Sequence, residues 1–266
     1  MYLKYWGLAK HPFENVPDTN FMYYSSEHNE ALARLLYAVN GNKGIALITG
    51  EVGCGKTLLS RVFIQQLDDA KYDIGLMTNP KLEPMDFLID VLRNFGLHPS
   101  ADQTKSSLLN LLNEKLLDNY RNDVTTVLII DESQLISKEV FEEIRLLLNF
   151  QLNNRFLMTI ILLGQPELNL IIKEMAQLDQ RIAIRYHLNP FNLRETAEYI
   201  SFRLTKAGSK TGTINDGALR EIYSYSRGIP RLINNICDMA LMGGFIAKAK
   251  AFDSDIVKNA LQDTSR

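Results

Sequence analysis

The sequence predicts an α/β fold in which a parallel five-stranded sheet is flanked by helices and followed by a C-terminal, all-helical lid. Three observations lead to this prediction. Short β-rich runs alternate with longer segments of helical period as far as residue 190, which is typical of α/β proteins. Four of these runs are almost continuously apolar, as expected for strands that helices cover on both faces. After Pro190 and Phe191 only helical periodicity remains.

The expected elements of the α/β core follow one another in order. The strands are Ile45–Thr49, Asp73–Thr78, Val127–Ile130, Thr159–Leu163 and a shorter run at Tyr186–Leu188. The helices between them are Thr57–Leu67, Pro84–Phe95, Ser106–Tyr120 and Lys138–Leu148. In the last of these, Val140, Ile144 and Leu147 share one face and the acidic residues face outward, so the helix is amphipathic. We expect residues 1–191 to form this core, N-terminal segment included.

The rest of the chain, residues 192–266, is expected to fold as the helical lid. Its predicted helices are Arg194–Lys206, Asp216–Ser224, Pro230–Ala247 and Asp253–Leu261. Turns that contain glycine, serine and threonine join them.

The composition argues against several classes of protein. The 266 residues carry 29 Lys and Arg against 31 Asp and Glu, so the net charge of -2 gives no general attraction for nucleic acid. Only Cys54 and Cys237 are present, too few for a disulfide framework. The longest apolar stretches are shorter than the roughly 18–20 residues of a membrane-spanning helix, and the N-terminus has no signal-peptide pattern. We therefore expect a cytoplasmic protein.

The residues after the first expected strand have the pattern of a phosphate-binding loop. The pattern G-x-x-x-x-G-K-[ST] is matched by Gly50, Glu51, Val52, Gly53, Cys54, Gly55, Lys56 and Thr57, and Leu58 continues into the helix. Glycines let successive backbone N–H groups converge on phosphate oxygens at the start of a helix. Lys56 is expected to bridge the β- and γ-phosphates, and the Thr57 hydroxyl to bind Mg²⁺. A glycine turn without a ligand has the same spacing, but the strand, loop and helix together favour nucleotide binding.

Two adjacent carboxylates end the third expected strand. Val127–Ile130 runs directly into Asp131 and Glu132, which must lie at the carboxyl edge of the sheet, where ligands of open α/β folds bind. Asp131 is expected to hold Mg²⁺ through water, and Glu132 to polarise the water that attacks the γ-phosphate. A strand that ends in Asp-Glu is by itself often only the start of a turn. The loop upstream is what favours the catalytic interpretation.

Further polar residues follow the next strands. Gln165, after Thr159–Leu163, could touch both the attacking water and the γ-phosphate, or it could cap the helix that begins near Pro166. Arg181 and Arg185 are expected just before the last strand, and Arg231 opens a lid helix. Phosphoryl transfer needs positive charge near the phosphates, although arginines on a solvated helix face are the common alternative.

In this order the motifs resemble those of an AAA+ ATPase, and more closely those of the general secretion pathway protein A family, the ExeA type. The matching residues span nearly the whole chain: Tyr5–Leu8, Pro12-Phe13, Pro17-Asp18, His28 to Leu36, the loop, Thr78–Pro80, Asp131–Gln134, Leu146–Asn149, Leu163–Leu168, Gln180–Ile182, Glu195-Thr196 and Gly228–Asn234. Transposition ATPases of the TniB and TnsC type share several of these motifs.

The resemblance implies an ATPase that uses ATP and Mg²⁺ and assembles as a homo-oligomer, a hexameric ring with ATP between protomers. Arg181 becomes the favoured arginine finger for the neighbouring protomer, with Arg185 as the alternative, and Arg231 becomes the sensor of the lid. Asn79 would restrain Glu132 until a partner binds.

The cellular role that this resemblance implies is to drive assembly or operation of a cell-envelope secretion or pilus system, such as type II secretion. Membrane or envelope proteins would be the partners and would recruit the protein to the inner membrane. The alternative is a DNA-binding adaptor in transposition, to which a locally basic lid would contribute. Full-length ExeA-type proteins continue into a membrane span and a peptidoglycan-binding region, whereas this sequence ends at Arg266 as a short member or a fragment.

Two weaker signals concern the nucleotide. Backbone N–H groups and Lys56 should favour the thiolate of Cys54, so we expect that its alkylation abolishes nucleotide binding; the alternative is a small residue that fills space. Among the N-terminal aromatic residues Tyr24 is the candidate neighbour of adenine, although packing of the segment explains most of these rings better.

Overall fold

The computed structural model describes residues 2–100, 102–152, 155–209 and 214–264. Contacts between Cα atoms divide the chain into two compact units. The sheet unit comprises residues 27–50 and 59–188, and the helical unit comprises the N-terminal segment to Ser26 with residues 51–58 and 189–266. Each unit is described by itself below.

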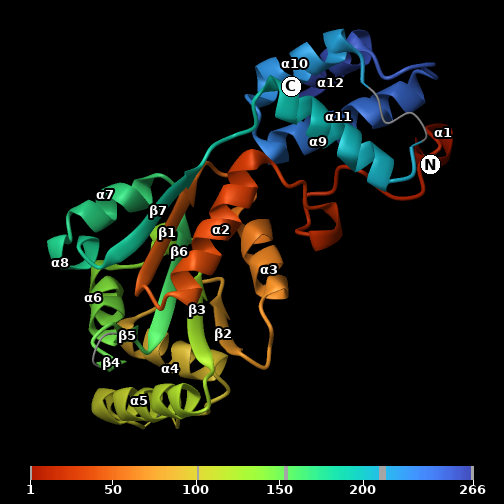
Figure 1. Ribbon diagram of the computed structural model, residues 1–266. Coiled ribbons are helices and arrows are strands. Elements are labelled where there is room, and N and C mark those ends of the chain that lie inside the picture. The colour runs from red at the N-terminus through yellow and green to blue at the C-terminus, as the bar shows by residue number, and fades with distance from the viewer. Residues whose placement is uncertain (1, 101, 153–154, 210–213, 265–266) are drawn as a thin grey trace. The chain divides into compact units, whose positions relative to one another are not determined.

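The sheet unit confirms the predicted parallel five-stranded sheet. Its strands are β1 (Ile45–Gly50), β2 (Tyr72–Met77), β3 (Thr125–Ile130), β6 (Met158–Gly164) and β7 (Ile182–Leu188). They are ordered β2-β3-β6-β1-β7, and every neighbouring pair is parallel (Figure 1). The central strands β1 and β6 are buried along their whole length, because helices cover both of their faces.

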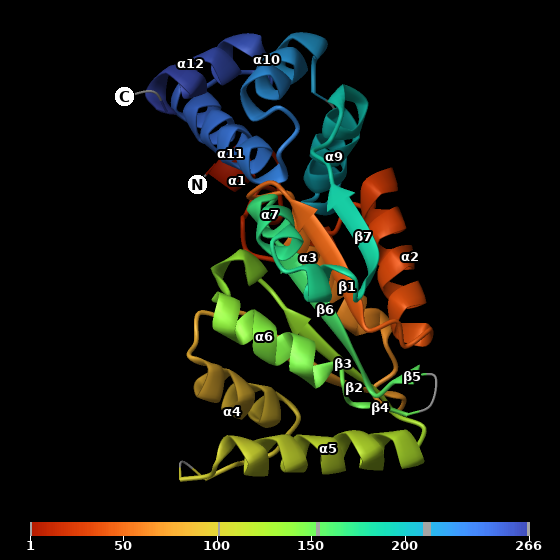
Figure 2. The ribbon, with the colours of Figure 1, turned by 90° about the vertical axis from the view of Figure 1, so that its left-hand side faces the viewer.

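Helices lie on both sides of this sheet. In Figures 1 and 2, α2 (Ser26–Asn40) and α3 (Lys56–Gln66) lie on one side, and α6 (Lys138–Leu147) and α7 (Glu167–Lys173) lie on the other. Helix α4 (Pro84–Asn94) packs on β2, and α5 (Lys105–Arg121) packs on β3 and α4. A large apolar core joins α4, α5, α6 and α7 to alternate residues of β1, β3 and β6.

Short elements complete the sheet unit. They are the 3₁₀ turn η2 (Ser133–Leu135), helix α8 (Ala176–Asp179) and the antiparallel pair β4 (Gln151–Leu152) and β5 (Arg155–Phe156). Helix α2, the pair of short strands and α7 have no counterpart among the elements expected from periodicity, whereas β7 begins at Ile182 and not at Tyr186. Arg185 therefore lies inside β7, opposite Leu47, and the expectation that it precedes the strand is wrong.

The helical unit is built from four lid helices and the N-terminal segment. The lid helices are α9 (Leu193–Lys206), α10 (Asp216–Ser226), α11 (Pro230–Ile246) and α12 (Ser254–Thr264), which agree with the expected helices to within three residues at each end. Asn192 and Glu195 form a capping box at the start of α9, with the Glu195 N–H donating to Asn192 Oδ1 at 2.9 Å. This reciprocal cap explains why α9 begins at Leu193, directly after Asn192.

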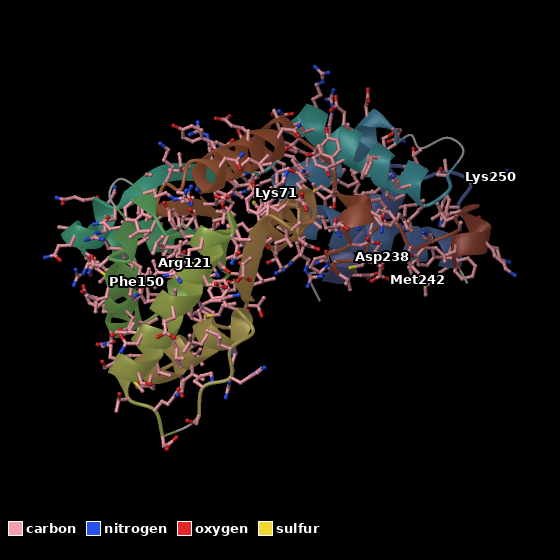
Figure 3. All side chains as sticks on the ribbon, turned by 60° about the horizontal axis from the view of Figure 1, so that its bottom comes forward. Lys71, Arg121, Phe150, Asp238, Met242 and Lys250 are labelled. Atoms are coloured by element: carbon pink, nitrogen blue, oxygen red, sulfur yellow. The ribbon has the colours of Figure 1, made fainter. Side chains whose placement is uncertain are left out.

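The N-terminal segment packs on the lid helices. It contains α1 (Tyr2–Tyr5) and the 3₁₀ turn η1 (Thr19–Phe21), and the side chains of Tyr2, Leu8 and Phe13 are buried in the same apolar cluster as α9, α10, α11 and α12. Trp6 Nε1 donates to Leu241 O at 2.8 Å, and Tyr2 donates to Asp238, a residue of α11 labelled in Figure 3. We expected this segment to belong to the core. Its apolar side chains instead complete the core of the helical unit.

Candidate nucleotide-binding site

The ends of three neighbouring strands define one edge of the sheet. Strand β1 ends at Gly50, β3 at Ile130 and β6 at Gly164, and β6 lies between the other two. Because the strands are parallel, the residues that follow them leave the sheet at the same carboxyl edge, where open α/β folds bind ligands. The chain passes from Gly50 directly into the glycine-rich loop, and from Ile130 directly into the acidic pair.

The glycine-rich loop is compact. Gly53 has φ +87° and Gly55 has φ +96°, conformations that side chains with a Cβ rarely adopt. The Lys56 ammonium donates to Glu51 O at 3.0 Å, and the Cys54 N–H donates to the same carbonyl at 3.2 Å. Helix α3 begins at Lys56, so its first N–H groups lie in the loop. Positive φ at both glycines followed by a helix N-terminus is the combination on which phosphate-binding loops are built.

The remaining loop residues differ in exposure. Glu51 and Val52 are exposed, whereas Thr57 and Leu58 are half-buried in the first turn of α3. A Cβ on Gly50 would lie 2.8 Å from Leu188 O, so the exit from β1 also requires glycine.

Cys54 is not the reactive thiolate that its position suggested. The side chain is buried, and this burial raises the pKa of the Cys54 thiol to about 11, although the charge of Lys56 acts in the opposite direction. The residue is therefore a neutral thiol at physiological pH, and the alternative of a small, space-filling side chain describes it better.

Arg231 lies beside the loop within the helical unit. Its N–H donates to Gly53 O at 3.3 Å, and a Cβ on Gly53 would lie only 2.6 Å from Arg231 Cβ. The backbone of α11 can approach so closely because Gly53 has no side chain. The side chain of Arg231 is exposed. The structure therefore brings together the loop and the arginine that opens this lid helix.

The acidic pair lies on a tight turn in the sheet unit. Asp131 is buried, its N–H donates to Met77 O at 2.8 Å, and its Oδ1 accepts the Glu132 N–H at 2.9 Å. Glu132 is left-handed, with φ +53°, and Ser133 Oγ donates to Ile130 O at 2.8 Å to close the turn.

A glutamine that periodicity did not single out links the acidic pair to the end of β6. Gln134 Nε2 donates to Glu132 Oε2 at 2.6 Å, and Gln134 Oε1 accepts the Gln165 N–H at 3.0 Å. Gln165 is not a helix cap, because the N-cap residue of α7 is Pro166. Asn79, the expected restraint on Glu132, is exposed after β2, and Gln134 makes the contact expected of it.

The other two predicted arginines lie elsewhere on the sheet unit. Arg181 precedes Ile182, which pairs with Ile45 at the amino end of β1, and its guanidinium donates to Asn149 Oδ1 at 3.0 Å. The two ends of β1 are about 17–20 Å apart at about 3.3 Å per residue. Arg185 donates to Asp179 Oδ1 at 2.5 Å. Arg181 therefore lies at the amino end of the sheet, whereas Arg185 lies within β7 opposite Leu47.

The donors proposed for Mg²⁺ suit that ion. Magnesium prefers oxygen ligands, keeps several waters, and binds through one or two protein groups together with substrate phosphates. The Thr57 hydroxyl and the buried carboxylate of Asp131 are oxygen donors of this kind. Among the described residues no group of three or more His, Cys, Asp and Glu forms a separate metal site.

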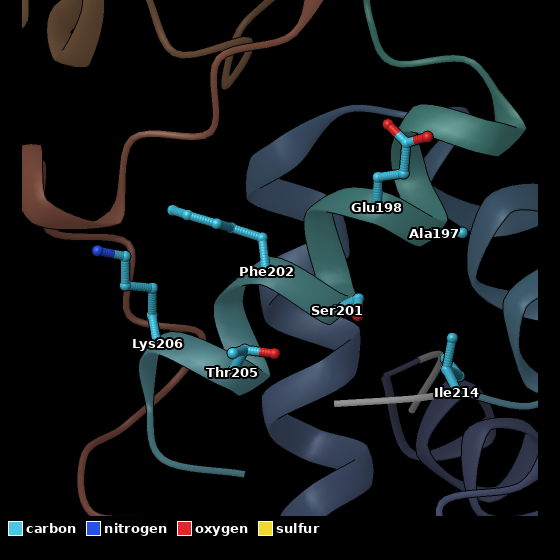
Figure 4. A pocket seen from close by; sticks show the side chains of 7 residues that line it. All are labelled: Ala197, Glu198, Ser201, Phe202, Thr205, Lys206 and Ile214. Carbon is cyan, nitrogen blue, oxygen red and sulfur yellow. The ribbon is translucent and has the colours of Figure 1, made fainter. Parts of the chain in front are cut away.

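Two other features belong to the helical unit. Tyr24 is about half exposed in the N-terminal segment. A mainly apolar groove runs along α9 and is lined by Ala197, Glu198, Ser201, Phe202, Thr205, Lys206 and Ile214 (Figure 4). In the part of the chain that the structure describes, no helix combines the length and apolar character that crossing a membrane requires.

The sequence and the fold of this chain were compared with those of known proteins. The model of the AAA domain family matches residues 39–172, a segment that includes the loop, the acidic pair and Gln165. The chain therefore belongs to the AAA family of ATPase domains.

The resemblance to the general secretion pathway protein A family is confirmed at the level of sequence. The chain is 38% identical over 247 residues to General secretion pathway protein A of Aeromonas hydrophila, and the match covers 92% of this chain. The chain spans 45% of the length of that relative.

Solved structures show the same fold at low sequence identity. Cdc6p from Pyrobaculum aerophilum gives a TM-score of 0.67 at 15% identity, with 92% of this chain and 70% of that chain covered. The Aeropyrum pernix ORC2 protein gives 0.65 at 17% identity, covering 88% and 66%. A Thermotoga maritima RuvB variant gives 0.58 at 20% identity, covering 90% and 69%.

Proposed function

We propose that this protein binds ATP with Mg²⁺ and hydrolyses it to drive assembly or operation of a cell-envelope secretion or pilus system. The observation that carries the enzymatic part is the conformation of the loop. Gly53 and Gly55 have positive φ, and the loop leads from β1 into the N-terminus of α3. The acidic pair, which ends β3 at the same edge of the sheet, supports hydrolysis as well as binding.

In this proposal the loop holds the phosphates. Backbone N–H groups between Gly53 and Thr57 would donate to the phosphate oxygens, and Lys56 would exchange its hydrogen bond to Glu51 O for one to the β- and γ-phosphates. Thr57 and Asp131 would hold Mg²⁺, and the ion would supply positive charge to the phosphates. Tyr24 remains our candidate contact for adenine.

Hydrolysis then depends on the residues after β3 and β6. Glu132 would accept a proton from water while the water oxygen bonds to the γ-phosphorus and the bond to the β–γ bridging oxygen breaks, which releases ADP and phosphate. Gln165 would contact the water or the γ-phosphate. Arg231, whose backbone is bonded to Gly53, would couple the state of the loop to the lid.

We propose Arg181 as the finger that completes the site of a neighbouring protomer. The distance between the ends of β1 supports action in trans, because Arg181 lies at the amino end of the sheet. This requires a homo-oligomer, for which we propose a hexameric ring. Asn149 holds the guanidinium in position for such a contact.

The proposed cellular role follows the name of the relative from Aeromonas hydrophila. Partners would then be membrane or envelope proteins that recruit this protein to the inner membrane. The chain spans 45% of the length of that relative, and we propose that this part is sufficient to contact such partners.

Two measurements test the enzymatic part. Nucleotide binding with and without Mg²⁺ should show affinity for ATP, and Lys56→Ala should weaken it by on the order of a hundredfold to a thousandfold, because one lysine–phosphate contact contributes about 4 kcal/mol. Phosphate release at steady state should be lost in Glu132→Gln while ATP stays bound. Absence of magnesium-dependent ATP binding in the wild type would refute the proposal.

The cellular role needs a separate experiment. Deletion of the gene should abolish secretion or pilus assembly, and wild-type protein but not Lys56→Ala should restore it. The alternative role as a transposition adaptor predicts binding to DNA in a mobility-shift assay that requires ATP and weakens steeply with salt. Such binding without a secretion or pilus defect would favour that alternative.

A further inference from the structure

We infer that Gln134 is a positioning residue for hydrolysis, which fixes the carboxylate of Glu132 against the end of strand β6. This inference rests on the proposed function, in which Glu132 is the base that activates water. In this inference Gln134 orients the Glu132 carboxylate and does not itself contact the nucleotide.

The Gln134 side-chain amide makes one hydrogen bond as a donor and one as an acceptor. Nε2 donates to Glu132 Oε2 at 2.6 Å, and Oε1 accepts the Gln165 N–H at 3.0 Å. A carboxylate can only accept and a backbone N–H can only donate, so the two partners determine which way the side-chain amide faces. The Gln134 side chain therefore connects the backbone of Gln165, after β6, to the carboxylate of Glu132, after β3, in one orientation of its amide.

The end of β6 is shaped to receive this side chain. A Cβ on Gly164 would lie 3.0 Å from Gln134 Oε1 and 2.6 Å from Leu168 Cδ2, so a side chain at this position would displace both. Gln134 lies within η2, and the bond from Ser133 Oγ to Ile130 O ties this turn to β3. Both ends of the link are thus attached to strands of the same sheet.

The link has a consequence for catalysis. Glu132 is left-handed on a tight turn, and Gln134 is a side chain that contacts its carboxylate. The hydrogen bond to Oε2 fixes the plane of the carboxylate, so the position of both oxygens follows that of β6 through Gln134. Loss of the link should lower the hydrolysis rate by about tenfold to a hundredfold, since misplacement by about 1 Å can have an effect of this size.

Two substitutions separate the donor from the acceptor. Gln134→Met keeps the length of the side chain and removes both hydrogen bonds. Gln134→Glu keeps an acceptor for the Gln165 N–H, removes the donor to Glu132 and places a second negative charge beside Glu132. The matched control is Gln177→Met, because Gln177 is an exposed residue of α8.

The expected result is a split between turnover and binding. Both Gln134 variants should lower kcat by about tenfold to a hundredfold, with the affinity for ATP within about twofold of wild type, as for a contact that acts on the base alone. Gln177→Met should match wild type. In a Glu132→Gln background Gln134→Met should add nothing further, since residues that act as a unit are not additive.

The outcomes distinguish the inference from the function on which it rests. Wild-type kcat in Gln134→Met and Gln134→Glu, with Glu132→Gln inactive, would overturn the inference and leave the ATPase proposal standing. A parallel loss of kcat, ATP affinity and thermal stability would also overturn it, because the role would then be structural. If Gln134→Met does not fold, Gln134→Glu carries the same test. A wild type that neither binds nor hydrolyses ATP removes both proposals.

Discussion

At the scale of single residues, Gly53 shows how two independent requirements select glycine. Its φ of +87° is unfavourable for other residues, and Arg231 Cβ occupies the space that a side chain would need. The first requirement concerns phosphate binding and the second concerns packing of α11. One residue therefore serves the loop and its contact with the lid helix.

Gly53→Ala should weaken ATP binding and lower the free energy of unfolding by about 1–3 kcal/mol, the usual cost of a strained backbone. Equilibrium denaturation and nucleotide titration measure the two effects. The control is Gly243→Ala in the same unit, since Gly243 lies within α11 and a Cβ there would meet nothing within 4 Å among the described residues. This control should be neutral or stabilise by up to about 1 kcal/mol. Equal effects of both substitutions would contradict our account.

Cys54 provides a prediction on pH. Its pKa is raised from 9.0 to about 11 in the folded protein, so the thiol contributes stability below pH 9 that is lost as the pH rises through 11. Alkylation of the native protein should therefore be slow at neutral pH and accelerate toward pH 11. The rate measured by mass spectrometry, with the denatured chain as reference, checks this. Rapid modification of Cys54 at pH 7 would show that the thiolate is accessible after all.

At the scale of elements, the N-terminal segment is held on α9 by a buried arginine. Arg203 donates to Pro12 O at 2.5 Å and to Glu14 O at 2.7 Å, and its guanidinium lies 4.9 Å from the centre of the Phe21 ring. These contacts satisfy the charge with backbone carbonyls and an aromatic face. The segment and α9 therefore behave as one packed element.

Arg203→Leu should lower the free energy of unfolding by about 2–4 kcal/mol, because it leaves buried carbonyl groups without a donor. Limited proteolysis should then cut within the N-terminal segment first. Arg194→Leu is the control on the same helix, because Arg194 is exposed and its ion pair with Glu198 lies at the surface, so little change is expected. Resistance to protease equal to wild type in Arg203→Leu would refute this role.

At the scale of the whole molecule, the proposed arginine finger requires a second copy of the chain. Arg181 lies at the amino end of the sheet, whereas the loop and the acidic pair follow the carboxyl ends of β1 and β3. A catalytic site that contains Arg181 as well as the loop and the acidic pair must therefore take the arginine from one protomer and the other residues from a second. Oligomerisation would then be a condition for turnover.

Mixing inactive variants tests this directly. Arg181→Ala and Glu132→Gln should each have little ATPase activity, and a mixture should recover part of it at interfaces that combine one intact finger with one intact base. Phosphate release across mixing ratios measures the recovery. The same experiment with Arg185→Ala in place of Arg181→Ala tests the other candidate finger. The guanidinium of Arg185 is hydrogen-bonded to Asp179 of its own protomer. Mixed assemblies that remain inactive would exclude Arg181 as the finger.

The sequence by itself determined the parallel sheet, the four lid helices, the position of the loop and the strand end that carries the acidic pair. These features depend on local properties: runs of apolar residues, helical period, glycines that permit positive φ, and covalent connection from strand to loop. Such signals act within about one element, so they can be read without knowing what that element packs against.

Only the tertiary structure decided the contacts between residues distant in sequence. The N-terminal segment joined the lid helices because its apolar side chains complete their core, the burial of Cys54 reversed the expected effect of Lys56, and Gln134 was found bonded to Glu132 and Gln165. Burial and hydrogen bonding depend on partners that chain folding brings together, and no periodicity along the sequence specifies those partners.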